Sequence, residues 1–192
     1  MTRRKGFATI PEPPVPAYQS PIEFGRMWEL VASRPHARIL EVGSLFGGTL
    51  WWWSHLPQIT ELVSVDMPTE WEPLRDGVRE AREQWAGWFG GRCEFTMVDG
   101  DSQAPETIAR VEGPFDFAFI DGDHSYGGVR ADWLNYSPLV RSGGLVAFHD
   151  TWPNFDRHEP GVVRWVDELR HHLPSIEWTS PDGVGICAFE VP

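Results

Sequence analysis

Residues 117–150 read FAFIDGDHSYGGVRADWLNYSPLVRSGGLVAFHD, and this stretch decides the fold. It opens on an apolar run that breaks into Asp121-Gly122-Asp123-His124, and it closes on a second apolar run that stops at His149-Asp150. Each run is typical of a short buried strand whose carboxyl end passes into polar chain. Between them, residues 129–139 are long enough for a crossover helix, which makes the two strands parallel.

A parallel pair brings together polar residues that are distant in the sequence. The carboxyl ends of adjacent parallel strands lie side by side, and open α/β sheets hold their ligands there. We therefore expect Asp121, Asp123, His124, His149 and Asp150 to form one cluster. The alternative is that these acids act only as turn formers and helix caps, as Asp often does after a strand.

The rest of the chain continues the alternation of strand and helix. Strands are predicted at residues 38–44, 62–66, 93–98, 117–120, 145–148, 175–180 and 185–191. Helices are predicted at residues 21–33, from 48 onward, and at 71–89, 105–111, 129–139 and 162–172. The last two strands read as a hairpin through Pro181-Asp182-Gly183, which makes the final strand antiparallel to its neighbour. The fold class is α/β, a seven-stranded and mostly parallel sheet.

The amino-terminal residues differ in character from the rest. Residues 1–19 are expected to form an extended arm, because residues 6–21 hold five prolines and little periodicity. Such an arm is disordered unless it lies on the body of the protein, or on a neighbour, as a lid. Residues 20–192 are expected to form a single domain. Trp51, Trp52 and Trp53 cannot all face one side of a helix, so at least one is expected at the surface or at a contact between copies, which leaves a homo-oligomer open.

Composition narrows the range of partners. The formal net charge of −12 disfavours a nucleic-acid partner, which would need clustered Lys and Arg. No run approaches the ~20 apolar residues that span a bilayer, and no signal peptide is recognisable. Cys93 and Cys187 lie in separate apolar runs and read as reduced, buried thiols. We expect a cytoplasmic protein that acts on a small molecule, without membrane attachment.

A glycine-rich turn follows the first strand, with Gly43, Gly47 and Gly48. Glycines let a backbone approach a ligand closely, and the helix behind them offers free N–H groups. Asp66 ends the second strand at about the spacing of a ribose-binding carboxylate. Leu45 breaks the dinucleotide fingerprint, Thr49 breaks the phosphate-loop pattern, and no Gly-x-Ser-x-Gly elbow exists. A nucleoside ligand without a pyrophosphate remains.

The ordered motifs ILEVGSLFGG, LVSVD, DFAFIDGDHSYGGVRADW and SGGLVAFHD resemble those of class I S-adenosylmethionine-dependent methyltransferases. The most similar branch is the cephalosporin-hydroxylase-like and macrolide-sugar O-methyltransferase group, with catechol-type O-methyltransferases as more distant relatives. The resemblance covers about residues 20 to 192. It implies a Rossmann-like sheet with helices on both faces and a reversed final strand.

The resemblance also implies roles for particular residues. Those at the cofactor are Glu41, Gly43, Ser44 and Gly47 at the methionine end, Asp66 at the ribose, Asp101 and Ser102 at the adenine, and Asp121. Asp121 and Asp150 match metal ligands, and His124 matches a general base. At His149 the catechol-type relatives carry a carboxylate; we retain His149 as a candidate ligand, although hard cations prefer oxygen.

The sequence thus predicts S-adenosylmethionine-dependent O-methylation of a small-molecule hydroxyl, assisted by magnesium or manganese. Two alternatives stay open. One is a metal-independent N- or C-methyltransferase, which the His149 departure favours. The other is a non-catalytic subunit that binds the cofactor, which the intact Asp121, His124 and Asp150 disfavour. Glu41 has a structural alternative as a strand-end residue, and Asp132, on the crossover helix, is expected to be solvated or salt-bridged.

Overall fold

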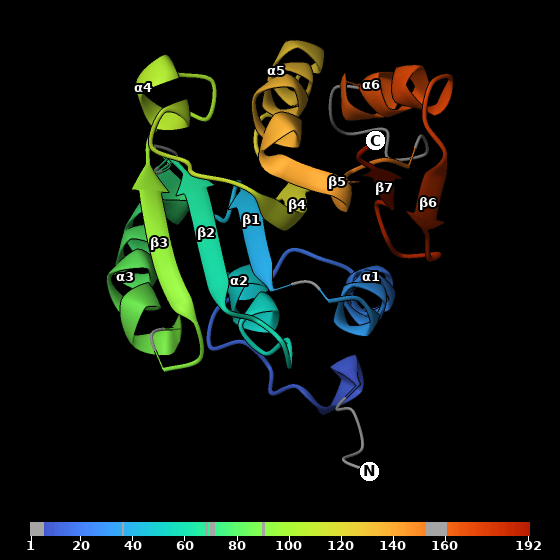
Figure 1. Ribbon diagram of the computed structural model, residues 1–192. Coiled ribbons are helices and arrows are strands. Elements are labelled where there is room, and N and C mark those ends of the chain that lie inside the picture. The colour runs from blue at the N-terminus through green and yellow to red at the C-terminus, as the bar shows by residue number, and fades with distance from the viewer. Residues whose placement is uncertain (1–5, 36, 68, 70–71, 90, 153–160) are drawn as a thin grey trace.

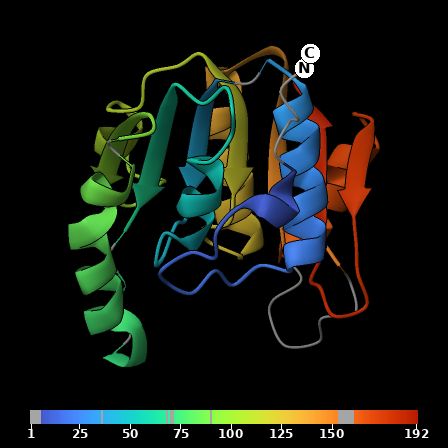
Figure 2. The same cartoon turned by 90° about the horizontal axis from the view of Figure 1, so that it is seen from below.

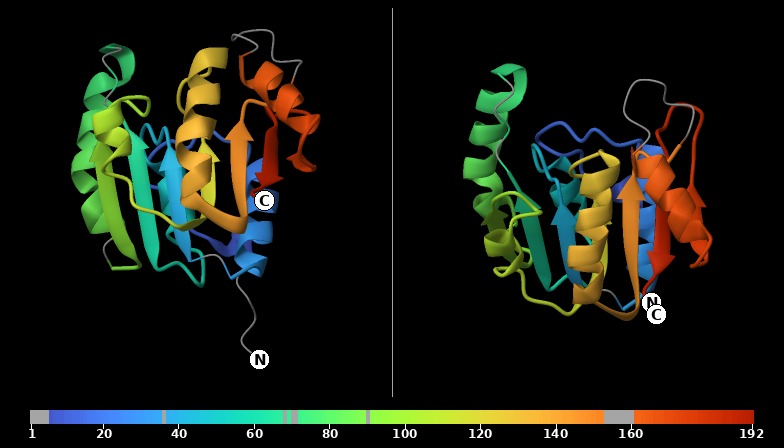
Figure 3. Two further views of the ribbon diagram at one scale, coloured as in Figure 1. Left: turned by 45° about the horizontal axis from the view of Figure 1, so that its top comes forward. Right: turned by 90° about the horizontal axis from the view of Figure 1, so that it is seen from above.

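The computed structural model describes residues 6–35, 37–67, 69, 72–89, 91–152 and 161–192. Their backbone forms a seven-stranded sheet in the order β3-β2-β1-β4-β5-β7-β6, covered by helices on both faces (Figure 1, Figure 3). Strands β1 to β5 pair in parallel, whereas β7 is antiparallel to both of its neighbours, β5 and β6. The predicted fold class, with its reversed final strand, is confirmed.

The strands are short and alternate their side chains between two buried layers. They are β1 Arg38–Val42, β2 Glu61–Asp66, β3 Glu94–Asp99, β4 Phe115–Ile120, β5 Val140–His149, β6 Ser175–Trp178 and β7 Ile186–Glu190. In β4, Phe117 and Phe119 pack in one layer, while Ala118 and Ile120 pack in the other. A strand buried on both faces reads as a continuous apolar run, which is why β4 stood out in the sequence.

Helices cover the sheet on both sides. They are α1 Pro21–Ser33, α2 Gly48–Trp53, α3 Glu72–Phe89, α4 Pro105–Ile108, α5 Tyr126–Tyr136 and α6 Gly161–Arg170, with the short 3-10 turns η1 Phe7–Thr9 and η2 Ser137–Leu139. Buried side chains of α1, α2 and α3 pack on one face of the sheet, and those of α5 and α6 on the other. Figure 2 shows these two helical layers from below.

Several boundaries differ from the sequence prediction for identifiable reasons. Helix α5 begins at Tyr126 rather than at Val129, because Ser125 caps it by accepting a hydrogen bond from the Gly128 N–H at 3.0 Å. Strand β5 begins at Val140 rather than at residue 145. Gly143 and Gly144 therefore lie inside the strand. The strand is irregular there: Gly143 has a φ of 75°, and the pairing with β4 shifts register between Phe115 and Phe117. Trp71, the predicted start of α3, lies outside the described residues.

The register of the three central strands places the motifs at one edge of the sheet. Val42 of β1 is level with Ile120 of β4, and Ile120 is level with Phe148 of β5. The chain leaves all three strands at that edge, so the residues that follow them are neighbours. This edge, the carboxyl edge of the parallel strands, is where the sequence predicted the ligand site.

Residues 6–19, which we call the N-terminal arm, lie on the body of the protein (Figure 2). The ring of Phe7 packs edge-on against Trp52 with a centroid distance of 5.2 Å. Trp51 donates its indole N–H to the Pro11 carbonyl at 3.0 Å, and Trp52 and Trp53 are buried. The arm therefore covers part of the tryptophan run that the sequence left to the surface or to a second copy. Residues 1–5 of the predicted arm lie outside the described residues.

Two further expectations concern the chain as a whole. Across the described ranges, we find no helix with the length and apolar character needed to cross a membrane. Cys187 is a buried free thiol and Cys93 a partly buried one, in agreement with the expectation of unpaired cysteines.

Candidate active site

A cavity of about 1060 Å³ opens at the carboxyl edge of the sheet. Its wall combines the turn after β1, the ends of β2 and β5, the loops after β3 and β4, and the N-terminal arm. The wall includes nine residues that the sequence proposed: Gly43, Ser44, Asp66, Asp101, Ser102, Asp121, His124, His149 and Asp150. These residues come from separate strand ends, and the topology alone brings them together.

Glu41 and Gly47, which the resemblance places at the cofactor, are not among the residues of the cavity wall, and their contact with a ligand stays a prediction. Glu41 lies on β1 facing α2, fully buried, where it accepts hydrogen bonds from Thr49 Oγ1 at 2.7 Å and Trp53 Nε1 at 2.8 Å. It therefore fastens α2 to the sheet. The sequence could not separate this role from ligand contact, because both place an acid near the glycine turn.

The glycines of the turn have structural reasons of their own. Gly43 has a φ of 87°, and a Cβ on it would collide with the Asp121 backbone carbonyl. Gly47 has a φ of 84°, and a Cβ there would lie 2.5 Å from the indole nitrogen of Trp85, which itself bonds the Phe46 carbonyl. Gly43 thus permits the close approach of β1 and β4, and Gly47 permits the packing of α3.

Asp66 is the last residue of β2 and forms part of the cavity wall. Its Oδ1 accepts a hydrogen bond from the Ser44 N–H at 3.1 Å, and its Oδ2 forms an ion pair with Arg82. Burial raises the pKa of Asp66 to about 6, against the opposing charge of Arg82 and the Ser44 N–H. Arg82 also pairs with Asp99 at the end of β3. The sequence analysis missed Arg82, which lies on α3, 16 residues after Asp66.

The loop after β3 presents Asp101 and Ser102 to the same cavity. Ser102 donates its hydroxyl to Asp132 Oδ1 at 2.7 Å, and its carbonyl accepts the Tyr136 hydroxyl at 2.8 Å. Asp132 is fully buried, which overturns the expectation of a solvated or salt-bridged acid. Burial raises the pKa of Asp132 to about 6. Asp132 and Tyr136 on α5 therefore fix the position of Ser102 through these two hydrogen bonds.

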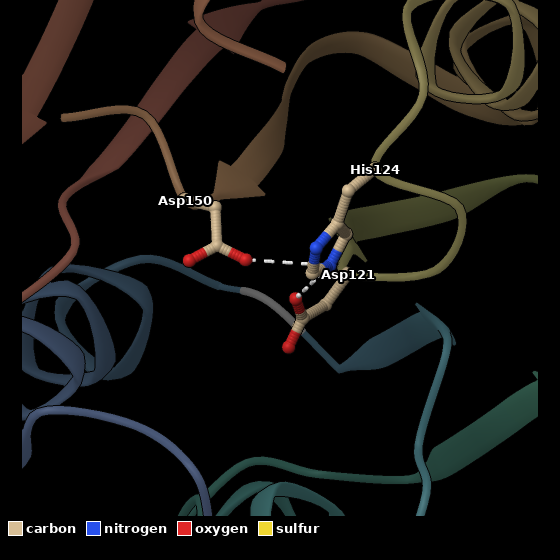
Figure 4. Close-up of side chains that lie close together, drawn as sticks. All are labelled: Asp121, His124 and Asp150. Carbon is tan, nitrogen blue, oxygen red and sulfur yellow. Dashed lines mark ion pairs between the residues drawn. The ribbon is translucent and has the colours of Figure 1, made fainter. Parts of the chain in front are cut away.

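Two acids and two histidines meet at the ends of β4 and β5. His149 Nδ1 lies 3.1 Å from Asp121 Oδ1 and 3.5 Å from Asp150 Oδ2. His124 Nε2 lies 3.4 Å from Asp121 Oδ1 and 3.3 Å from Asp150 Oδ2. Figure 4 marks these two ion pairs with dashed lines. Asp150 adopts a φ of 57°, a left-handed conformation that non-glycine residues seldom use. We call Asp121, His124, His149 and Asp150 the acid–histidine cluster.

The electrostatics of this cluster follow from the pairing of opposite charges. Burial disfavours the proton on His149, but Asp121 and Asp150 outweigh it and raise the pKa of His149. The hydrogen bond that His124 donates to Asp121 likewise raises the pKa of His124. Burial would raise the pKa of Asp121, yet the two histidines lower it. Asp121 is therefore ionised, and it favours the protonated form of the two histidines beside it.

The same cluster contains a group of donors suited to a cation. Asp121, His124 and Asp150 each offer one ligand atom, and these atoms lie within 4.8 Å of one another. Two carboxylates suit a hard divalent ion such as Mg²⁺, and an imidazole nitrogen suits Mn²⁺ or softer metals better. His149 is not in this group of ligand atoms. Its Nδ1 is directed at the carboxylates of Asp121 and Asp150, so His149 pairs with these acids.

One residue at the cluster was absent from the sequence analysis. Gln19 of the N-terminal arm donates its Nε2–H to Asp121 Oδ2 at 2.8 Å. Nothing in a proline-rich arm marks a glutamine as a site residue. The only signal was the expectation that the arm would act as a lid if it lay on the body.

The family follows from comparison with known proteins. A family model described as a methyltransferase domain matches residues 40–151, more than half of the chain. The chain belongs to the methyltransferase domain family. Apart from Ile39, the four sequence motifs fall within this match, so their resemblance to methyltransferases is confirmed at the level of the family.

Curated relatives of this methyltransferase-domain chain include two O-methyltransferases. The demethylmacrocin O-methyltransferase of Streptomyces fradiae is 28% identical over 169 residues, which cover 75% of this chain and 38% of the relative. The mycinamicin VI 2''-O-methyltransferase of Micromonospora griseorubida is 40% identical over 52 residues, which cover 27% and 13%. The chain spans well under half the length of the curated relatives that it matches.

Solved structures agree with the methyltransferase fold. The O-methyltransferase TomG of Streptomyces achromogenes, solved with SAM, gives a TM-score of 0.63 at 20% identity and covers 93% of this chain and 83% of TomG. An O-methyltransferase of Bacillus cereus, solved with SAH, gives 0.61 at 22% identity and covers 95% and 85%. At these identities the likeness shows the fold, and it confirms the Rossmann-like prediction.

The buried carboxyl group of Glu41 generates a prediction about pH. Burial raises the pKa of Glu41 to about 8 from 4.5, so the folded protein keeps a proton that the unfolded chain releases. The free energy of unfolding therefore falls between pH 4.5 and 8. A Glu41→Gln variant lacks this dependence because an amide does not titrate in this range. The amide can also keep the contact with Thr49, since its N–H₂ can donate to Thr49 Oγ1. Its advantage over the wild type should grow to roughly 1–4 kcal/mol by pH 8 in urea unfolding.

The exposed Glu94→Gln on β3 is the matched control, and it should follow the wild type at every pH. If the Glu41→Gln and wild-type stability curves run parallel from pH 5 to pH 8, Glu41 is charged in the folded protein and the interpretation is wrong.

Proposed function

We propose that this protein transfers a methyl group from S-adenosylmethionine to a hydroxyl group of a small molecule, with the assistance of a divalent cation. The observation that carries the proposal is a single cavity with Asp66 at one end and the acid–histidine cluster at the other. A carboxylate that can bind the ribose of the cofactor and a group that can accept a proton, both in one cavity, suit methyl transfer to a hydroxyl. The TomG and Bacillus cereus structures, which hold SAM and SAH, support the choice of cofactor.

The walls of the cavity suit the parts of this cofactor. Asp66 accepts hydrogen bonds from Ser44 and Leu45 and pairs with Arg82, which leaves about one of its four lone-pair sites for a ribose hydroxyl. Ser102 and Asp101 lie on the neighbouring loop, where an adenine would follow the ribose. Gly43 and Asp121 lie at the central strand ends, toward which the methionine part would extend. We assign Ser44 to the same wall, through its backbone.

The size of the cavity leaves room for a second molecule. Sites for one drug-sized ligand measure roughly 300–1,000 Å³, and this cavity measures about 1060 Å³. The acid–histidine cluster lies beyond the expected position of the ribose and is therefore the natural place for the methyl acceptor.

His124 and the two acids would do the chemistry at the acceptor. S-adenosylmethionine supplies an electrophilic methyl group on a sulfonium sulfur, and a divalent cation supplies positive charge that lowers the pKa of an acceptor hydroxyl. Asp121 and Asp150 would hold the cation through their oxygens, which leaves His124 Nε2 to accept the hydroxyl proton. The walls of the cavity would position the acceptor oxygen in line with the methyl group that the cofactor would supply, with S-adenosylhomocysteine as the leaving group.

The raised pKa of His124 is consistent with this division of labour. Asp121 and Asp150 cause the increase, and a cation on these carboxylates would remove much of the cause. His124 would then be neutral at neutral pH, as a base must be. His149 would remain beside the carboxylates as a charge and hydrogen-bond partner. One observation favours the metal-independent alternative: the two histidines already balance both acids without a cation.

The wider setting of the activity follows the sequence-based expectations. We expect a small-molecule acceptor and neither nucleic acid nor membrane as partner, because the net charge of −12 repels phosphate backbones and anionic surfaces. A cytoplasmic location and a homo-oligomer stay predictions.

The first prediction of this proposal concerns the cofactor. S-adenosylhomocysteine should raise the melting temperature, because a ligand of the native state stabilises it by mass action. Asp66→Asn should weaken its binding by about 1.5–3 kcal/mol, the cost of hydrogen bonds to a charged group. Asp99→Asn is the matched control, since Asp99 also pairs with Arg82 but is not in the cavity wall. A shift with NAD or ATP and none with S-adenosylhomocysteine, measured by differential scanning fluorimetry, would refute the cofactor assignment.

The second prediction concerns the metal. Activity should disappear with a chelator and return with magnesium or manganese, and Asp121→Asn or Asp150→Asn should abolish the return. Asp123→Asn, two residues from Asp121 but outside the group of ligand atoms, should leave metal activation intact. Methyl transfer that survives thorough chelation would select the metal-independent alternative instead. A manganese soak with anomalous scattering should place the ion between Asp121 and Asp150.

The third prediction concerns the base. His124→Ala should lower turnover by roughly 10²–10⁴-fold and leave S-adenosylhomocysteine affinity unchanged, because the imidazole acts on the acceptor proton. It should also remove the acidic limb of the pH–rate profile. His171→Ala, at an exposed residue in the turn that follows α6, serves as the control. Near-normal turnover, or a joint loss of cofactor binding and thermal stability, would make His124 a structural residue.

A further inference from the structure

The body of the protein is shaped to receive the N-terminal arm. Phe7 packs against Phe24 and Trp28, each at a centroid distance of 5.9 Å. Its ring lies over Gly25 in the middle of α1, where a Cβ would come within 2.6 Å of the ring. Glycine inside a helix costs about 0.5–1 kcal/mol relative to alanine. Gly25 is therefore explained by the arm and not by the helix.

A second glycine makes the same point closer to the cavity. A Cβ on Gly48, the first residue of α2, would lie 2.5 Å from the Pro16 carbonyl oxygen and 2.7 Å from the Ala17 Cβ. Gly48 has no left-handed backbone to explain it, so the close approach of the arm is the reason for the glycine. Pro16 and Ala17 then form part of the cavity wall.

The chain is held just as firmly after the arm. Ser20 Oγ lies 3.1 Å from Ser180 Oγ, on the loop between β6 and β7. Glu23, fully buried, accepts hydrogen bonds from the Ser180 N–H at 2.6 Å and the Gly185 N–H at 3.1 Å. Gln19 thus lies between two anchored segments, and its position at the cavity does not depend on its own contacts.

Gln19 uses this position to hold one oxygen of Asp121. The side chain is 9% exposed, and its Nε2–H bonds Asp121 Oδ2 at 2.8 Å. The amide orientation is fixed, because only the N–H₂ end can donate to a carboxylate. Asp121 Oδ1 is the oxygen that faces His149 and His124. The two oxygens of Asp121 are therefore divided between the arm and the acid–histidine cluster.

We propose that Gln19 is a positioning residue of the active site, which fixes the Asp121 carboxylate so that Oδ1 alone faces the site of methyl transfer. The inference rests on the proposed function in so far as Asp121 holds the cation beside the acceptor. It adds the N-terminal arm to the machinery and gives the arm a chemical role. Partners that orient a metal-binding carboxylate typically contribute 10–100-fold to metal affinity or activity.

The test compares Gln19→Leu and Gln19→Glu with a matched control, Gln58→Leu. Gln58 Nε2 donates only to the Val31 and Arg34 carbonyls, away from the cavity. Gln19→Leu should weaken Mn²⁺ binding, measured by calorimetry, by roughly 10–100-fold and lower kcat with little change in the KM for S-adenosylmethionine. Gln58→Leu should change neither quantity.

Gln19→Glu distinguishes positioning from packing. Glutamate has the shape of glutamine, so a packing role predicts that Glu at this position is better tolerated than Leu. The proposal predicts the reverse at pH 7, since a second carboxylate would replace the donor beside Asp121. The melting temperature of Gln19→Glu should lie below that of Gln19→Leu at pH 7 and recover as the pH falls, when the new acid can donate a proton.

The order of melting temperatures needs neither cofactor nor cation. If the wild type fails to bind Mn²⁺ or to transfer methyl groups, the proposed function fails while this order still reports on the Gln19–Asp121 contact. If Gln19→Glu matches the wild type in melting temperature and Mn²⁺ affinity, or if Gln19→Leu matches Gln58→Leu, the positioning role is overturned.

Discussion

Negative charge buried at one edge of the sheet is the constraint on which the rest of this structure depends. An acidic chain, with a net charge of −12, places several carboxyl groups where parallel strands end. An isolated buried carboxylate is costly, so each must be neutralised, paired or hydrogen-bonded. The protein uses a different means for each. Glu41 keeps a proton, Asp66 is paired with Arg82, and Asp121 is paired with two histidines and Gln19.

These means differ in what they leave available to a ligand. Glu41 accepts hydrogen bonds from Thr49 and Trp53, lies outside the cavity wall and serves as a structural link. Asp66 is part of the cavity wall, where Ser44, Leu45 and Arg82 already use most of its capacity to accept hydrogen bonds. Asp121 and Asp150 are paired with imidazoles, and these carboxylates raise the pKa of both histidines. The balancing charge at this end of the cavity is carried by a proton on a histidine, whereas at Asp66 it is the permanent charge of Arg82.

Much of the fold could be predicted because the strands carry local signals. β4 and the end of β5 are apolar runs that stop at acids, and parallel topology then places Asp121 beside Asp150 without further information. The partners of those acids gave no such signal. Arg82 lies in the middle of an amphipathic helix, Asp132 in the crossover helix, and Gln19 in an arm without periodicity. Their roles depend on which helix face or which stretch of arm reaches the strand ends, and packing decides that.

The structural role of Glu41 was hidden for the same reason. β1 alternates its side chains, so Leu40 and Val42 face the layer of α5 and α6, while Glu41 faces α2. The position in the motif suggested a ligand contact, whereas the alternation of the strand placed the carboxyl group beneath the cavity. Gly25 and Gly48 show the converse case. Both look like ordinary weak points in a helix, and both are explained by contacts from residues 7, 16 and 17, which no local pattern connects to them.

The two outer strands of the sheet bear on how copies of this protein can meet. An edge strand exposes unpaired backbone N–H and C=O groups that can extend a sheet into another molecule. Here β6 has only four residues, and β3 exposes Glu94 and Asp99 along its length. Short and charged edges resist pairing between sheets. If copies of this chain associate, we therefore expect contacts between helix and loop surfaces. The sheet is not expected to continue from one copy into the next.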